Sequence, residues 1–216
     1  MIVIVDYETG NLGSILNMMK KAGCEAKISS SLSDIEKADK LILPGVGAFD
    51  AGMDKLHSKD LISVLNKKVI EDKIPILGFC LGMQLMTKKS EEGKMEGLGW
   101  MDAETVRFRF SETEKQFKVP HMGWKFVSVK KENRLFKDMY ENSRFYFAHS
   151  YYVKCKNAED ILTTTSYSEE FVSSFCKGNI LGVQFHPEKS HKYGMKILKK
   201  IPIQMQYVAS LSDGLN

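Results

Sequence analysis

The segment that most constrains this chain is Gly-Phe-Cys-Leu-Gly at positions 78–82, which directly follows the apolar run at 74–77. Such a run is typical of a buried strand, and the residues after Gly82 have the composition of a helix. Glycines on both sides allow a sharp strand-to-helix turn that exposes the central side chain. The helix N-terminus beneath the sulfur favours thiolate over thiol. We predict that Cys80 is a nucleophile; the alternative is a buried core cysteine.

The first half of the chain alternates strand-like and helix-like segments. Apolar runs at 2–5, 40–43 and 74–79 are separated by apolar residues at helical spacing, as in 12–22 and 61–70. This alternation predicts a parallel sheet with right-handed crossover connections. In such sheets, binding sites lie beyond the carboxyl ends of the strands.

The second half consists of short β-like runs, which predict antiparallel or mixed strands added to the parallel core. A closing helix is expected over Tyr193–Ile201, ending at Pro202, with a peripheral tail at 203–216. The expected architecture is one three-layer α/β domain over 1–202, with a mostly parallel central sheet, helices on both faces and an added antiparallel or mixed sheet. The β-like runs are 101–110, 116–119, 125–130, 145–147, 151–154, 161–165, 171–176 and 180–185.

Composition argues against several other classes of protein. A net charge of +4 is too small to indicate nucleic-acid binding. No run of 18 or more apolar residues predicts a membrane span, and the first residues do not have the pattern of a signal peptide. None of the four cysteines forms a CxxC pair, so no zinc or dithiol site is indicated. We expect a cytoplasmic protein with reduced thiols.

A nucleophilic cysteine needs a base, and the base needs an orienting group. Of the five histidines, His186 is the best candidate, because it ends an apolar run and precedes a proline that stiffens the turn. In an extended chain Glu188 lies on the same side as His186, where its carboxylate can hold one imidazole tautomer. The pair predicts a catalytic triad with Cys80; the alternative is a surface turn with an incidental ion pair.

Two further segments have more than one interpretation. The loop Pro44–Gly47 follows a strand and contains two glycines. Its N–H groups, with the Leu81 amide, can form an oxyanion hole for acyl transfer, although Pro-Gly turns without such a role are common. The mixture of His, Met and Trp in Pro120–Trp124 fits either a protein interface or a core loop.

Three motifs together resemble those of the class I, or triad, glutamine amidotransferases: the loop 44–47, the segment 78–84 and the segment 184–188. Their order and spacing match that family along almost the whole chain. Further segments are similar to one branch, the glutaminase subunit of imidazole glycerol phosphate synthase. These segments are Asp6-Tyr7, Gly10-Asn11, 120–124, 149–152, 187–190 and 192–194.

The resemblance implies a reaction in which Cys80 attacks the side-chain amide of glutamine. His186 then serves as base and protonates the leaving ammonia, while Glu188 orients it, and water releases glutamate from the thioester. By the same resemblance, backbone amides near Val46, Gly47 and Leu81 stabilise the oxyanion. The positions that match glutamine-holding ones are Gln84, Glu92 and the backbone of Ser150 and Tyr151; those that match partner-facing ones are Trp124, Tyr146 and Lys189.

The resemblance also implies a partner, a (β/α)₈ cyclase subunit that receives the ammonia and forms imidazole glycerol phosphate in histidine biosynthesis. It implies no metal or organic cofactor. In this family the isolated glutaminase is nearly silent and is switched on by the partner and its ligand. A physical reason is that the loop 44–47 turns an N–H into the oxyanion site only then; one such donor is worth about 10²–10³ in rate.

Two departures from the branch pattern affect the expected docking surface: Lys125 stands where Asn is usual, and Glu8 stands where Gly is usual. One alternative is therefore a paralogue that supplies ammonia to a sugar amidotransferase of surface polysaccharide synthesis, which the stretch 97–103 faintly resembles. More distant alternatives are a stand-alone cysteine peptidase or hydrolase, against which the segments 44–47 and 186–188 argue, and a regulatory subunit without chemistry, against which the intact triad argues.

Overall fold

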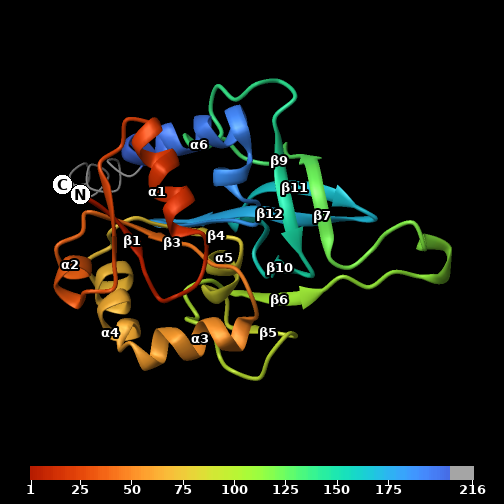
Figure 1. Cartoon of the computed structure of the whole chain (residues 1–216). Helices are drawn as coiled ribbons and strands as arrows, with labels where there is room; N and C mark the ends of the chain where they lie inside the picture. Colours follow the sequence, from red (N-terminus) through yellow and green to blue (C-terminus); the bar gives the residue numbers. More distant parts are fainter. Residues whose placement is uncertain (205–216) are drawn as a thin grey trace, which may run out of the picture.

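The computed structural model describes residues 1–204 and has a large sheet at its centre with helices on both faces (Figure 1). The parallel part of the sheet has the order β2 (Ala26–Ser29), β1 (Ile2–Val5), β3 (Lys40–Leu43), β4 (Ile76–Phe79) and β13 (Ile180–Val183). Because both faces of the sheet are covered, β1, β3, β4 and β13 are almost continuously apolar, whereas the edge strand β2 is half-buried and contains Lys27 and Ser29. The three-layer α/β prediction is confirmed.

The sheet then continues through strands from the second half of the chain. The antiparallel strands β12 (Glu169–Lys177), β10 (Tyr151–Cys155) and β6 (Ala103–Arg107) follow β13, and β5 (Lys89–Ser90) pairs parallel with β6. Strand β11 (Ile161–Tyr167) pairs with β12, and β8 (Ser128–Val129) pairs with β11. A separate antiparallel pair consists of β7 (His121–Phe126) and β9 (Arg144–His149).

Each face of the parallel sheet packs against its own group of helices. Helices α1 (Leu12–Lys21) and α6 (His191–Gln204) pack on one face. Helices α2 (Leu32–Glu36), α3 (Phe49–Ser58), α4 (Leu61–Asn66) and α5 (Leu81–Leu85) pack on the other. The chain continues from α4 as a π-helical segment, and short 3₁₀ turns lie in the loops. The π-helical segment is Lys67–Glu71, and the 3₁₀ turns are Glu112–Glu114, Ala158–Asp160 and Pro187–Lys189.

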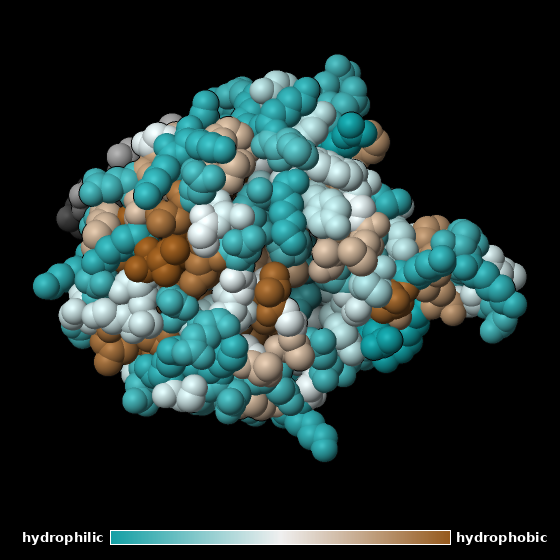
Figure 2. Space-filling view, in the orientation of Figure 1, coloured by the Kyte–Doolittle hydropathy of each residue, from teal (hydrophilic) through white to brown (hydrophobic). Residues whose placement is uncertain are grey.

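Alternate residues of the central strands enter the two cores. Val3, Val5 and Leu41 pack with the α3 and α4 side, whereas Ile4 and Ile42 pack with the α1 and α6 side. The surface in Figure 2 is accordingly mostly hydrophilic, with only small hydrophobic areas. No helix in the described part of the chain has both the length and the apolarity to cross a bilayer.

The predicted N-terminal helix and its start are confirmed, because the Asn11 side chain accepts a hydrogen bond from the Ser14 amide (3.2 Å) at the start of α1. One other expectation is wrong, because the run 116–119 is not a strand but part of the turn before β7. For the segment 120–124, the core-loop alternative is wrong, since strand β7 begins at His121 and has alternately exposed residues.

The predicted end of the last helix at Pro202 is also wrong, since α6 continues to Gln204. A proline cannot donate to the carbonyl four residues earlier, which here belongs to Leu198. That carbonyl faces the Cys24 thiol instead (3.7 Å), and Lys40 donates to the Pro202 carbonyl (2.7 Å). Tertiary contacts therefore compensate for the missing helical bond. Positions 205–216 of the expected tail lie outside the described residues.

Candidate active site

Cys80 occupies the turn between β4 and α5 and has φ +50° and ψ −109°. A residue with a side chain rarely adopts this backbone conformation, and it persists only where its surroundings impose it. Two close approaches impose it here. A Cβ at Gly82 would lie 1.8 Å from the Leu43 carbonyl oxygen, and one at Gly78 would lie 2.7 Å from the Met83 nitrogen. The predicted strand-turn-helix geometry is therefore present.

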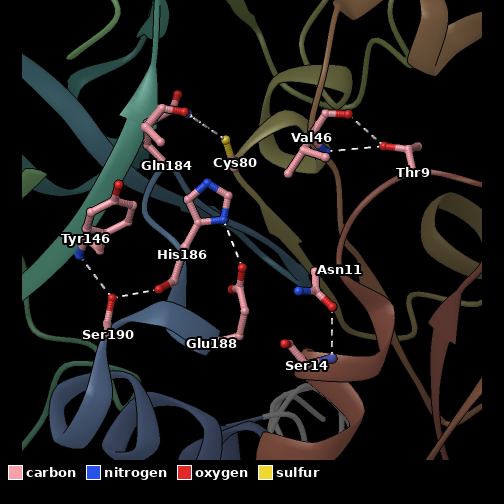
Figure 3. Close-up of polar contacts among 11 residues, drawn as sticks. Thr9, Asn11, Ser14, Val46, Cys80, Tyr146, Gln184, His186, Glu188 and Ser190 are labelled. Carbon is pink, nitrogen blue, oxygen red and sulfur yellow. Dashed lines mark hydrogen bonds and ion pairs between the residues drawn. The ribbon is translucent and has the colours of Figure 1, made fainter. Parts of the chain in front are cut away.

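The sheet brings His186 to the same edge as Cys80. Strands β4 and β13 are parallel neighbours, with Phe79 opposite Val183, so both chains leave the sheet side by side. The His186 Nδ1 atom lies 2.9 Å from Glu188 Oε1, and the two side chains are 3% and 4% exposed. Figure 3 shows the imidazole between the Glu188 carboxylate and the Cys80 sulfur, with its other nitrogen toward the sulfur. The three side chains thus converge.

The surroundings of His186 favour its charged form. Burial disfavours a charge on the ring, but the neighbouring Cys80 and Glu188 outweigh that effect and raise the pKa of His186 to about 10. An imidazolium beside a sulfur stabilises a thiolate, which is the nucleophilic form of cysteine. This arrangement suits attack on a carbonyl carbon followed by proton delivery to a leaving group.

Two residues that were not singled out from the sequence support the triad. Ser190 is fully buried; its hydroxyl accepts from the Tyr146 amide (3.0 Å) and donates to the His186 carbonyl (2.6 Å). Gln184 is also fully buried, and its Nε2 lies 3.7 Å from the Cys80 sulfur. Alternation along an extended chain could have identified Gln184, because it lies on the same side as His186.

A cavity of about 180 Å³ opens beside the sulfur. The residues expected to hold glutamine or to stabilise an oxyanion all line this cavity, although they come from four separate segments. Glu92 reaches it while one carboxylate oxygen accepts from the Phe49 amide at the start of α3 (2.9 Å). The lining residues are Val46, Gly47, Cys80, Leu81, Gln84, Glu92, Pro120, Ala148, His149, Ser150 and Tyr151.

The three amides expected to form the oxyanion hole are not equally available to donate a hydrogen bond into the cavity. The Val46 N–H donates to the Thr9 hydroxyl (3.2 Å), and that hydroxyl donates to the Val46 carbonyl (2.9 Å), as Figure 3 shows. The Leu81 amide lies in the first turn of α5, where amides have no carbonyl partner within the helix. Gly47 has φ +106° and lines the cavity. In this conformation the Val46 amide therefore serves Thr9 and not the cavity.

A pair of buried histidines adjoins the cavity. The His121 Nδ1 and His149 Nε2 atoms are 3.1 Å apart, and His149 Nδ1 lies 2.8 Å from the Tyr151 carbonyl oxygen. Burial lowers the pKa of His121 to about 4 and the pKa of His149 to about 3. Both rings are therefore neutral near pH 7. Since a carbonyl only accepts, the His149 proton lies on Nδ1, and His121 donates to His149 Nε2.

The three residues expected to face a partner lie together on one surface. Trp124 on β7 and Tyr146 on β9 are paired residues, with ring centroids 6.1 Å apart, and the Lys189 ammonium lies 6.0 Å from the Tyr146 ring centroid. On the same strand as Trp124, Met122 and Phe126 are 63% and 59% exposed. This face therefore combines exposed apolar residues with a cation close to the triad.

The two departures from the expected pattern do not contact the triad. Glu8 forms an ion pair with Lys59 (2.8 Å), and the Lys125 ammonium lies 5.3 Å from the Tyr167 ring centroid.

Among the residues that the structure describes, no group of three or more His, Cys, Asp or Glu side chains is arranged to hold a metal ion.

Fold and site together define a cysteine-dependent enzyme built on a mixed α/β sheet with a parallel core. Over residues 3–205 the chain matches the family model described as "Glutamine amidotransferase class-I". The chain belongs to the class I glutamine amidotransferase family.

Relatives of known name agree with this assignment. The chain is 55% identical to "Imidazole glycerol phosphate synthase subunit HisH 2" of Methanococcus maripaludis and 50% identical to the protein of the same name from Pseudomonas aeruginosa; each match covers 92% of this chain and 97% of the relative. A subunit HisH of Leptospira borgpetersenii is 40% identical, over 92% of this chain and 98% of the relative.

The fold is also shared with more distant proteins. PurLQS from Thermotoga maritima superposes with a TM-score of 0.66 at 16% identity, covering 94% of this chain and 97% of the other. The glutaminase domain of Trypanosoma brucei CTPS superposes with a TM-score of 0.63 at 18% identity, covering 95% and 94%. These likenesses show a common fold.

The close approach at Gly82 predicts that Gly82→Ala lowers the free energy of unfolding by at least about 3 kcal/mol, because the rigid Leu43 carbonyl must move. Gly13→Ala is the matched control: no atom lies within 4 Å of its added Cβ, and its position is helical, so stability should be unchanged or slightly higher. Urea unfolding measures both; equal stabilities of the two variants would contradict the packing argument.

The neutral histidine pair predicts a loss of stability in mild acid. The unfolded chain takes up protons at His121 and His149 below about pH 6.5, whereas the folded protein resists until about pH 4 and 3. The contribution of these two rings to stability is therefore fully present above pH 6.5 and should fall by at least about 2 kcal/mol by pH 4.5.

Urea unfolding at pH 7, 5.5 and 4.5 measures this loss. His149→Gln should flatten the dependence, whereas His57→Gln, at an exposed position on α3, should leave it as it is. An equally steep dependence in His149→Gln would assign the effect to other groups.

Proposed function

We propose that this chain is the glutamine-hydrolysing subunit of an imidazole glycerol phosphate synthase and supplies ammonia to a separate (β/α)₈ cyclase subunit. The observation that carries the proposal is the buried Cys80–His186–Glu188 arrangement beside a cavity, in a chain that shares 40–55% identity over 92% of its length with subunits of that name.

The geometry supports the following sequence of steps. The Cys80 thiolate attacks the amide carbon of glutamine, and the oxyanion that forms takes hydrogen bonds from backbone amides at the cavity wall, Leu81 among them. The C–N bond breaks as His186 gives its proton to the leaving nitrogen, which departs as ammonia. His186 then takes a proton from water, the resulting hydroxide attacks the thioester, and glutamate leaves as the thiolate re-forms. Glu188 holds the imidazole throughout.

Substrate recognition follows from the other cavity walls. The Glu92 carboxylate supplies the negative charge that an α-ammonium group needs, and Ser150 and Tyr151 line the same cavity. The surface that carries Trp124, Tyr146 and Lys189 is the proposed docking face for the cyclase. Its position beside the triad keeps the path of the ammonia short.

A second candidate function has one specific observation in its favour. The relatives at 55% and 50% identity both carry the numeral 2 in their names, which distinguishes them from another subunit of that name. A second copy can serve a different partner. We therefore retain the paralogue that feeds ammonia to a sugar amidotransferase. The chemistry at Cys80 would be the same in both cases, and only the acceptor of the ammonia would differ.

Partner capture distinguishes the two candidates. The tagged chain, expressed in its own cells, should recover a barrel protein that forms imidazole glycerol phosphate from its ribonucleotide substrate when glutamine is supplied. Recovery of a barrel protein that lacks this activity, together with a sugar amidotransferase, would favour the second candidate.

The nucleophile assignment predicts that Cys80→Ala abolishes release of glutamate from glutamine in the reconstituted complex, without loss of partner binding. Cys155→Ala is the matched control and should retain activity, because that thiol lies on β10 away from the cavity lining. A coupled glutamate assay and size-exclusion chromatography provide the two readouts. An active Cys80→Ala complex would refute the assignment.

Because the Val46 amide donates to the Thr9 hydroxyl, we predict that Thr9 lowers the rate of glutamine hydrolysis when the partner is absent. Thr9→Val removes both hydrogen bonds to Val46 and frees its N–H to turn toward the cavity. Glutamine hydrolysis by the isolated chain should then rise, by up to about 10²-fold, which is the value of one oxyanion donor. Thr9→Ser retains the hydroxyl and should stay near the starting rate. Equal basal rates in both variants would show that this contact does not limit the reaction.

A further inference from the structure

We infer that Gln184 is a positioning residue for the nucleophile: it donates a hydrogen bond to the Cys80 sulfur and holds it in the attacking form. The inference rests on the proposed glutamine hydrolysis for its catalytic meaning. Gln184 is fully buried, and its Nε2 lies 3.7 Å from the sulfur. Cys80 is 6% exposed, so this contact is shielded from water.

The direction of the Gln184 amide follows from the hydrogen bonds around it. Gln84 lies 2.9 Å from the Tyr151 carbonyl oxygen and 3.1 Å from the Gln184 amide. A backbone carbonyl only accepts, so Gln84 must present its NH₂ group to Tyr151. The second hydrogen of that NH₂ group points to Gln184, which must accept with Oε1. The Gln184 NH₂ group is thereby turned toward Cys80.

The Tyr151 carbonyl, which orients this series of hydrogen bonds, is itself held in place. It also accepts from the neutral ring of His149 (2.8 Å), whose other nitrogen accepts from His121 (3.1 Å). A continuous set of buried hydrogen bonds therefore runs from His121 on β7 to Cys80, and each donor direction in it is determined. Buried networks in which the donors are paired tend to be rigid and to specify one arrangement.

The sulfur has one other described polar neighbour besides the triad, the Ala148 carbonyl oxygen at 4.0 Å, which is a long contact. A donor that points at the sulfur favours the thiolate over the thiol. Gln184 and His186 both reach the sulfur, from different directions, and both belong to the segment that follows β13 (Figure 3). Unlike His186, the Gln184 amide keeps its hydrogens through every step of the reaction.

The test measures how fast iodoacetamide alkylates Cys80 from pH 5 to 10, followed at the Cys80 peptide by mass spectrometry. Gln184→Met retains the length of the side chain but removes the donor. The midpoint of the Cys80 profile should move upward by about one to two pH units. Gln184→Glu still accepts from Gln84 but places a carboxylate beside the sulfur, so its midpoint should rise at least as far.

The other thiols serve as internal controls. Burial raises the pKa of Cys155 to about 12 and also raises the pKa of Cys176, so both should label slowly and at the same rates in all variants. A folded variant, judged by circular dichroism and thermal unfolding, with an unchanged Cys80 midpoint overturns the inference. Since two variants are made, either one that folds decides the question.

The series of hydrogen bonds from Gln84 through Gln184 to Cys80 predicts a second result. Gln84→Met releases the Gln184 amide and should raise the midpoint by less than Gln184→Met does, and the double variant should match Gln184→Met alone. Additive shifts overturn the coupling. Alkylation requires neither glutamine nor a partner, so these results stand apart from the proposed function, which is tested by partner capture and by glutamine hydrolysis in the complex.

Discussion

The structure depends on one close approach, that of helix α5 to strands β3 and β4 at Gly82 and Gly78. A side-chain carbon at either position would meet backbone atoms at 1.8 or 2.7 Å, so only glycine lets the helix start where it does. This contact holds Cys80 at φ +50° and lifts its sulfur out of the sheet edge. Without this close approach, the Cys80 sulfur would not lie beside His186 and Gln184, which come from the segment after β13.

The second layer of organisation is polar and buried. The Tyr151 carbonyl accepts from Gln84, Gln84 also donates to Gln184, and Gln184 donates to the sulfur. The neutral ring of His149 donates to the same carbonyl and accepts from His121. The glutamine that contacts the sulfur, Gln184, lies on the segment after β13 that also supplies His186. Opposite these groups, the Thr9 hydroxyl keeps the Val46 amide out of the cavity. The site therefore combines a thiol with buried polar neighbours, which we propose as the nucleophile, and a loop at 44–47 whose Val46 amide is bonded to Thr9.

Much of this could be predicted from local patterns. The apolar runs and glycines around Cys80 predicted its turn. Glu188 was also expected beside His186, but a 3₁₀ turn at Pro187–Lys189, and not an extended chain, brings the two side chains together. Other features could not be predicted, because they depend on partners distant in sequence. Helix α6 continues through Pro202 because Cys24 and Lys40 contact its carbonyls. Strand β7, with its positive-φ Gly123, has a register set by pairing with β9.

The sequence by itself determined the chemical groups, the parallel core and the order of the strands along the chain, since these follow from side-chain type and from periodicities of 2 and 3.6 residues. Only the tertiary structure decided which groups meet. Placing β13 beside β4 joins positions about a hundred residues apart. The Tyr151 carbonyl then sets the direction of every amide in the chain leading to Cys80, because a carbonyl can only accept. Such directions arise from contacts in space, which no local pattern encodes.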